Sequence, residues 1–141
     1  MLSRSNIINV AQQAAFGAGY SWDLAQAAAK STVYLIEHQR DGFGALLEVL
    51  NFADGKRQPL DISGDGPVCG ITLGMHLSQL GKVPNDLPSK IVGEALLMAF
   101  IHDDKQVMIH KNWPAEIPDE IVRFAARINQ ASIPHTARAK R

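Results

Sequence analysis

The sequence predicts a helix-rich α+β fold. Along most of the chain, apolar residues recur every three or four positions, which is the spacing of a helix face that packs on a core. Ser, Asp, Pro and Gly stand where such helices would begin and end. One apolar run is followed by a polar tetrapeptide, a pattern typical of a β-hairpin. We therefore expect an N-terminal antiparallel helical hairpin, a buried central helix, one β-hairpin and a C-terminal helix.

Two amphipathic helices are predicted before Asp41. The hydroxyl of Ser3 or Ser5 can cap the first helix, and the Gly-Ala-Gly of residues 17–19 ends it. Ser21 caps the second helix. The inner faces are rich in alanine, and they comprise Ile7, Val10, Ala11 and Ala14 in the first helix, then Leu24, Ala25, Ala28, Thr32, Leu35 and Ile36 in the second. Because small side chains let two backbones approach and the connection is short, these helices should form an antiparallel hairpin.

A third helix is predicted after Asp41, whose side chain can cap it. Its apolar face comprises Phe43, Leu46, Leu47 and Leu50. Asp54 and Gly55 end the helix, and residues 55–66 are the most loop-like stretch of the chain. Within this stretch, we expect Leu60 and Ile62 to form a short edge strand.

A fourth helix is predicted between Pro67, which suits the first helical position, and Gly81, which suits the position just past the end. Apolar residues occupy most of its circumference: Val68, Ile71, Thr72 and Met75 on one side, and Leu73, Leu77 and Leu80 on another. Because a helix that is apolar nearly all round is usually buried, this one is expected at the centre of the domain.

The segment after the fourth helix allows two interpretations. Ala95–Ile101 is a short apolar run that periodicity alone cannot assign. We favour a β-hairpin, because residues 102–105 (HDDK) form a polar turn and residues 106–113 then suit a return strand. The alternative is a helix from Ser89 to Phe100.

The last predicted helix begins at Pro118 and carries Ile121, Phe124, Ala125 and Ile128 on one face. Residues 1–132 are expected to form a single globular domain, and residues 133–141 a mobile basic tail. A chain of 141 residues has the usual length of one domain, and its 46% hydrophobic content suffices for a packed core.

The charges of the chain balance, with 14 Lys and Arg against 14 Asp and Glu. This balance argues against a nucleic-acid or anionic-membrane partner, because such partners select a basic surface. It also removes the repulsion that keeps proteins monomeric, so we expect a homo-oligomer or a protein partner.

Location follows from three further features. Polar residues interrupt the N-terminal segment MLSRSNIINVAQQ, so we expect no signal peptide. The longest apolar run, Ala95–Ile101, is too short for a membrane helix. Cys69 is the single cysteine, so no intramolecular disulfide can form. The cytoplasm is the expected location.

Asp65, Cys69 and His76 are the candidate ligand-binding residues. If Pro67 begins the helix, Cys69 lies in its first turn, where free N–H groups stabilise a thiolate. His76 lies roughly 10 Å further along, too far for a direct Cys–His pair. The glycines around Asp65 can present N–H groups to an anion, but its carboxylate would repel a phosphate and suits a helix cap. An inert, packed thiol is the commoner role for such a cysteine.

The remaining histidines do not form a metal site on the predicted hairpin. His102, Asp103 and Asp104 with His110 are residue types that bind metals. With a four-residue turn, the two histidines face opposite sides of the sheet, and with a three-residue turn they are about 13 Å apart. Neither register brings both to one ion, although the helical alternative would reopen the question. We predict no metal and no cofactor.

Two stretches resemble an uncharacterised bacterial family. They are the Leu-Ser start followed by Gly17–Lys30 (GAGYSWDLAQAAAK), and, less closely, Pro67–Leu77 (PVCGITLGMHL). That family has no assigned activity and implies no functional residues. The alanine-rich helices are also faintly similar to the N-terminal helices of the malate/L-lactate dehydrogenase family that is unrelated to Rossmann enzymes. Where that family has a catalytic-site histidine, Arg40–Gly44 (RDGFG) has none, so the resemblance implies that this chemistry is absent.

The sequence therefore leaves the function undetermined and supports two hypotheses. No dinucleotide, P-loop, metalloprotease or hydrolase motif is present, which favours a non-catalytic domain that self-associates or binds another protein. The alternative is a small-molecule-binding protein or minor enzyme, with a pocket at the start of the helix predicted to contain Cys69. Whether the chain is an enzyme stays open.

Overall fold

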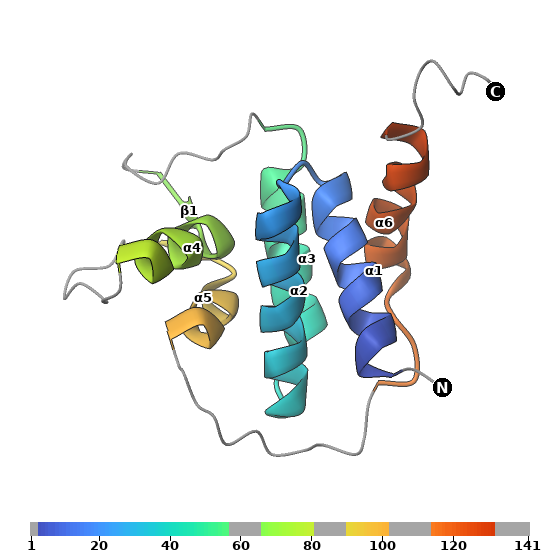
Figure 1. Ribbon diagram of the computed structural model, residues 1–141, viewed down its shortest axis with the longest axis horizontal. Helices are drawn as coiled ribbons and strands as arrows, with labels where there is room; N and C mark the ends of the chain where they lie inside the picture. The colour runs from blue at the N-terminus through green and yellow to red at the C-terminus, as the bar shows by residue number, and fades with distance from the viewer. Residues whose placement is uncertain (1–2, 57–65, 81–89, 102–113, 132–141) are drawn as a thin grey trace.

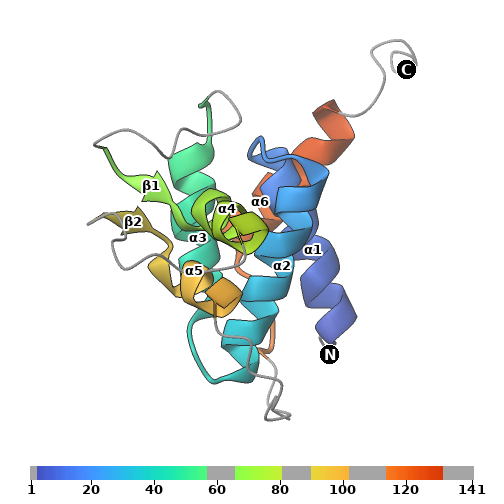
Figure 2. The same cartoon turned by 60° about the vertical axis from the view of Figure 1, so that its left-hand side comes forward.

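The computed structural model describes residues 3–56, 66–80, 90–101 and 114–131. In order, the elements of these residues are α1 (Arg4–Gly17), α2 (Trp22–Glu37), α3 (Gly42–Ala53), β1 (Val68–Cys69), α4 (Gly70–Leu80), β2 (Ile91–Val92), α5 (Glu94–Ile101) and α6 (Asp119–Ala131). Figures 1 and 2 show α1, α2, α3 and α6 as a bundle, with α4, α5 and the two strands on one side of it. The predicted helix-rich α+β class is confirmed.

The N-terminal helical hairpin forms as predicted. The side chain of Ser3 accepts the N–H of Asn6 at the start of α1, and Ser21 accepts the N–H of Leu24 at the start of α2. Asp41 caps α3 in the same way, through the N–H of Gly44. These caps satisfy N–H groups that would otherwise have no partner in the first turn of each helix. α1 and α2 then pack antiparallel (Figure 1).

The central helix is α2, and the prediction that the fourth helix would be central is wrong. α2 packs against α1, α3, α4 and α5, and half of its residues are buried: Ala25, Ala28, Ala29, Ser31, Thr32, Val33, Leu35 and Ile36. α4 lies across α2 at the edge of the bundle, and its side chains after Leu77 are exposed (Figure 1). Its apolar residues pack in two separate clusters and do not surround the helix with core. Ile71 joins the main core, while Leu73 and Leu77 pack with Val68 and Leu97.

The predicted β-hairpin is also wrong for the residues that the structure describes. Val68 and Cys69 pair in parallel with Ile91 and Val92, and the apolar run that follows is α5. Gly93 connects β2 to α5 with a φ of 69°, a left-handed conformation that glycine adopts without steric cost. Its carbonyl accepts the N–H groups of Leu96 and Leu97, which starts α5.

Several sequence predictions fall on residues outside the described ranges. They are the edge strand at Leu60 and Ile62, the return strand at residues 106–113, and the tail at 133–141.

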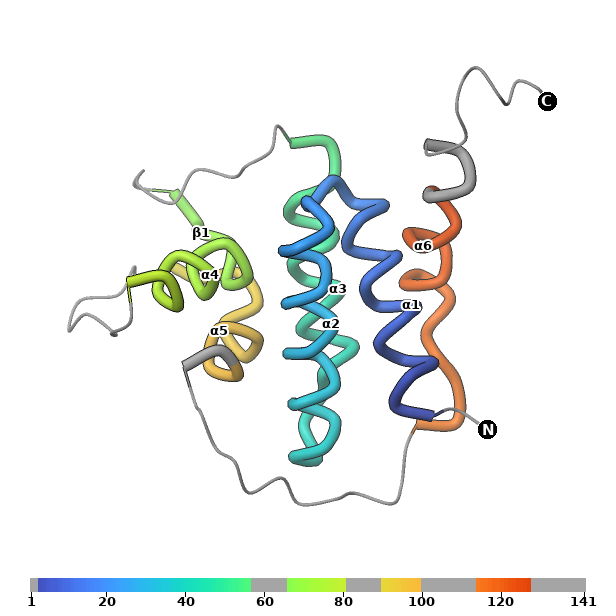
Figure 3. Tube along the Cα trace, viewed as in Figure 1, coloured from blue at the N-terminus to red at the C-terminus, as the bar shows by residue number. Residues whose placement is uncertain are grey.

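The C-terminal helix α6 lies side by side with α1, as Figures 1 and 3 show. A Cβ atom at Gly17 would stand 2.0 Å from the backbone oxygen of Phe124, so the two helices touch where α1 ends. Arg127 adds an ion pair to Asp54 at 2.6 Å, and its hydrogen bond holds the pKa of that exposed carboxyl below its usual range. Such surface pairs contribute little free energy, so α6 is held mainly by its packing along α1. No helix in the described part of the chain is long and apolar enough to span a membrane.

Candidate functional site

Cys69 lies in the core, in strand β1 and not in the helix that follows it. The sequence placed it in a first helical turn, but α4 begins at Gly70, one residue later. Parallel pairing with β2 holds Val68 and Cys69 extended, a contact between segments more than 20 residues apart that local spacing does not reveal. Cys69 is 1% exposed.

A hydrogen-bond chain holds the thiol. The hydroxyl of Tyr20 donates to the carbonyl of Val49 at 3.3 Å, and the same oxygen lies 2.8 Å from the sulfur of Cys69. A carbonyl can only accept, so the hydroxyl proton goes to Val49 and the thiol S–H donates to Tyr20. Burial raises the pKa of Tyr20 far above its ordinary value, and the neighbouring Cys69 raises it further. These buried hydrogen bonds therefore give Cys69 a structural role.

The structure does not bring the sequence-predicted site residues together. Cys69 is buried, His76 is exposed on α4, and Asp65 lies outside the described residues. No cluster of three or more potential metal ligands occurs among the residues that the structure describes. His102, Asp103, Asp104 and His110 all lie outside these ranges. Of the three candidates, His76 alone has a described position beside a cavity.

That cavity is an open groove of about 700 Å³ where α4 crosses the N-terminal half of α2. We call it the α2–α4 groove. One wall is formed by α4 side chains: Thr72, Met75, His76 and Gln79. The other is formed by Ser21 and five residues of α2: Asp23, Leu24, Gln26, Ala27 and Lys30. The volume lies within the range typical of small-molecule sites, about 300–1,000 Å³.

The groove combines opposite charges with neutral polar and apolar groups. Asp23 and Lys30 both line it, and neither takes part in an ion pair among the described residues. The Oγ1 atom of Thr72 is buried without a hydrogen-bond partner in the described part of the chain. An unsatisfied buried hydroxyl costs about 1–3 kcal/mol, so a ligand that pairs with it would gain that free energy.

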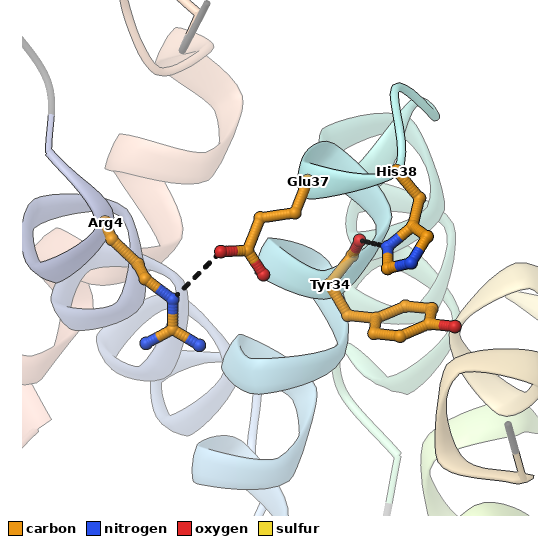
Figure 4. Close-up of polar contacts among 4 residues, drawn as sticks. All are labelled: Arg4, Tyr34, Glu37 and His38. Carbon is orange, nitrogen blue, oxygen red and sulfur yellow. Dashed lines mark hydrogen bonds and ion pairs between the residues drawn. The ribbon is translucent and has the colours of Figure 1, made fainter. Parts of the chain in front are cut away.

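Two smaller cavities continue the groove along α2. The next one, of about 330 Å³, shares Ala27 and Lys30 with the groove and is bordered by the ion pair of Arg4 and Glu37 (Figure 4). The third, of about 260 Å³, is enclosed by the C-terminal end of α2 and by α5, with Tyr34 in its wall. Cavities therefore follow one another along most of the length of α2.

His38 lies at the far end of this row of cavities. Its Nδ1 atom lies 2.8 Å from the carbonyl of Tyr34, and its ring stacks on the Tyr34 ring at 4.1 Å between centroids (Figure 4). Because the carbonyl accepts, Nδ1 carries the proton, and in the neutral ring Nε2 is an acceptor. Nε2 is buried without a partner among the described residues. The stacked Tyr34 ring covers this end of α2.

Sequence reasoning missed the α2 wall of the groove. Asp23, Gln26 and Lys30 belong to the polar face of an amphipathic helix, and the same pattern is found on any solvent-facing helix. Since the partner wall is about 50 residues away in the chain, no local spacing relates the two. His76 was identified because histidine is a chemically versatile residue, and the groove is where it lies.

Residues 2–68, just under half of the chain, match the model of a family described as "Protein of unknown function (DUF3726)". No curated protein and no solved structure matches the chain. The matched segment contains α1, α2 and α3, so it includes the α2 wall of the groove but not the α4 wall. The predicted resemblance to an uncharacterised family is confirmed over residues 2–68, which are similar to this family of unknown function.

Proposed function

We propose that this chain is a non-catalytic binding domain whose ligand site is the α2–α4 groove. The observation that carries the proposal is the groove itself, a cavity of about 700 Å³ in which opposite charges, hydroxyls and apolar side chains face one space. A non-catalytic role is supported by the position of the single thiol, since Cys69 is buried and bonded to Tyr20, away from His76. The proposed setting is the cytoplasm of a bacterium, a reducing compartment that suits one free thiol.

The packing of both walls supports a preformed site. α2 is buried on its opposite face among α1, α3 and α5, and α4 is anchored by Leu73 and Leu77 against Leu97. Walls held by packed cores do not pay a large ordering cost when a ligand binds. The groove therefore suits a ligand of modest size and affinity.

Filling the groove should abolish this binding. Ala27 is half-buried in the α2 wall of the groove, so the indole of Ala27→Trp would occupy the space that a ligand needs. The probe is a library of small polar and charged fragments, and binding is detected by ligand-observed NMR. We expect fragments that bind the wild type to lose binding in Ala27→Trp.

The matched control is Ala126→Trp, which adds the same side chain at an exposed position on α6. This variant should keep the wild-type fragment set. Fragments that bind Ala27→Trp as well as the wild type, or a wild type that binds no fragment, would contradict the proposal.

A second candidate function is self-association or binding of a protein partner, supported by an exposed aromatic pair. Phe16 and Trp22 pack edge to face at 5.2 Å between centroids, where α1 turns into α2. They are 37% and 50% exposed. Exposed aromatic side chains at a chain surface are typical anchors of protein interfaces. The balanced charge of the chain adds no repulsion between copies.

Trp22→Ser should shift a wild-type oligomer toward monomer in sedimentation velocity. A lost aromatic anchor typically costs about 2 kcal/mol or more of binding free energy, roughly thirtyfold in the dissociation constant. Leu80→Ser is the control, because Leu80 is 54% exposed at the end of α4 and away from the aromatic pair. A wild type that is monomeric at every concentration tested would exclude self-association, and an unchanged oligomer in Trp22→Ser would exclude this contact.

A further inference from the structure

Asp23 and Lys30 line the α2–α4 groove without an ion pair in the described part of the chain, and they have a defined spacing. Asp23 lies in the first turn of α2 and Lys30 follows seven residues later, so their Cα atoms are about 10.5 Å apart along the helix axis. Both side chains are exposed and line the same groove. A ligand lying along this wall therefore meets a carboxylate at one end and an ammonium group at the other.

Between these charges, the groove offers partners for amide groups and for small side chains. Gln26 and Gln79 come from opposite walls, and a side-chain amide both donates and accepts hydrogen bonds, as a peptide bond does. Leu24, Ala27 and Met75 supply the apolar surface. Met adapts its shape to irregular partners, which suits ligands with varied side chains.

An extended tripeptide has about the same length as the separation of the Asp23 and Lys30 Cα atoms along α2. Each residue spans about 3.3–3.6 Å, so three residues cover about 10–11 Å. The opposite charges of the two side chains also set the direction of the bound peptide. Its ammonium group pairs with Asp23 and its carboxylate pairs with Lys30. The reverse direction would place like charges together, and the partial positive charge at the N-terminus of α2 is smaller than the full charge of Asp23.

We infer that the ligand of the α2–α4 groove is a short free peptide of about three residues with both ends charged. This inference rests on the proposed function, because it names the ligand class of the same site. A purely anionic ligand would satisfy Lys30 and His76 but would be repelled by Asp23.

Calorimetric titration with three peptides tests the inference. Tri-alanine should bind, whereas N-acetyl-tri-alanine and tri-alanine amide should each bind about tenfold more weakly, since each lacks one charge-assisted contact. Lys30→Gln should weaken the binding of tri-alanine but not of tri-alanine amide. Asp23→Asn should weaken the binding of tri-alanine but not of the acetylated peptide. Capped peptides that bind as well as tri-alanine would overturn the inference.

The two proposals fail in distinguishable ways. If tri-alanine does not bind while Ala27→Trp still abolishes fragment binding, the ligand class is wrong and the binding groove stands. Stronger binding of tri-alanine to Asp23→Asn than to the wild type would identify an anion site instead. This result would also overturn the inference of a peptide ligand. If Ala27→Trp leaves fragment binding unchanged, both proposals are wrong.

Discussion

Gly17→Ala is expected to lower the free energy of unfolding by about 3 kcal/mol, the upper part of the range for overpacked positions. The added Cβ would lie 2.0 Å from the backbone oxygen of Phe124 and 3.3 Å from the Cβ of Arg127. A backbone atom cannot rotate out of the way as a side chain can, so α1 and α6 would have to separate. That separation would expose apolar surface of both helices, including Ile121 and Phe124.

Urea unfolding followed by circular dichroism measures this loss. Gly66→Ala is the matched control, because a Cβ at Gly66 has no neighbour within 4 Å among the described residues, and its change should stay within about 0.5 kcal/mol. If Gly17→Ala is as stable as this control, the close contact between α1 and α6 is wrong.

Cys69 is expected to react with iodoacetamide at least about 1,000-fold more slowly in the folded protein than in urea. The thiol is 1% exposed and bonded to Tyr20, so alkylation requires an opening of the core. For a domain with a stability of about 5 kcal/mol, global opening populates roughly one molecule in several thousand. The labelling rate, followed by intact-mass spectrometry, reports this fraction.

Tyr20→Phe provides a second measurement of the same contact. It removes the hydroxyl that bonds Cys69 and Val49, which costs about 1–2 kcal/mol, so labelling of Cys69 should accelerate roughly five- to thirtyfold. Rapid, stoichiometric labelling of the native wild type would contradict a structural role for Cys69 and would show that its thiol is reactive.

The helices with local start and stop signals were predictable. Ser3, Ser21 and Asp41 cap α1, α2 and α3 as expected, because an N-cap depends on residues only three positions apart. The C-terminal helix was predicted from its strong amphipathic spacing. In each of these cases, the information lies within a single helix.

The errors arise where distant segments decide the structure. Val68 and Cys69 are extended because they pair with Ile91 and Val92, and without that partner the residues resemble a helix start after Pro67. The run after Gly93 has no periodicity, because it is apolar on nearly every side. The polar residues 102–105 that follow it favour a hairpin turn. α4 was placed at the centre because its apolar residues were assigned to one core instead of two clusters.

The site was predictable only in part. His76 was a candidate from its chemistry, and it lines the groove. Asp23 and Lys30 lie on a polar helix face that has the same composition whether it meets solvent or a second wall. Only the crossing of α4 over α2, visible in Figure 2, turns these residues into a site.

Mapping bound fragments onto backbone amides by two-dimensional NMR tests the binding groove most directly. We expect the amide shifts to cluster at residues 23–30 of α2 and 72–79 of α4, and the amides of α6 to stay unchanged. Shifts that cluster elsewhere, for example around Phe16 and Trp22, would contradict the groove and favour the aromatic pair as the binding surface.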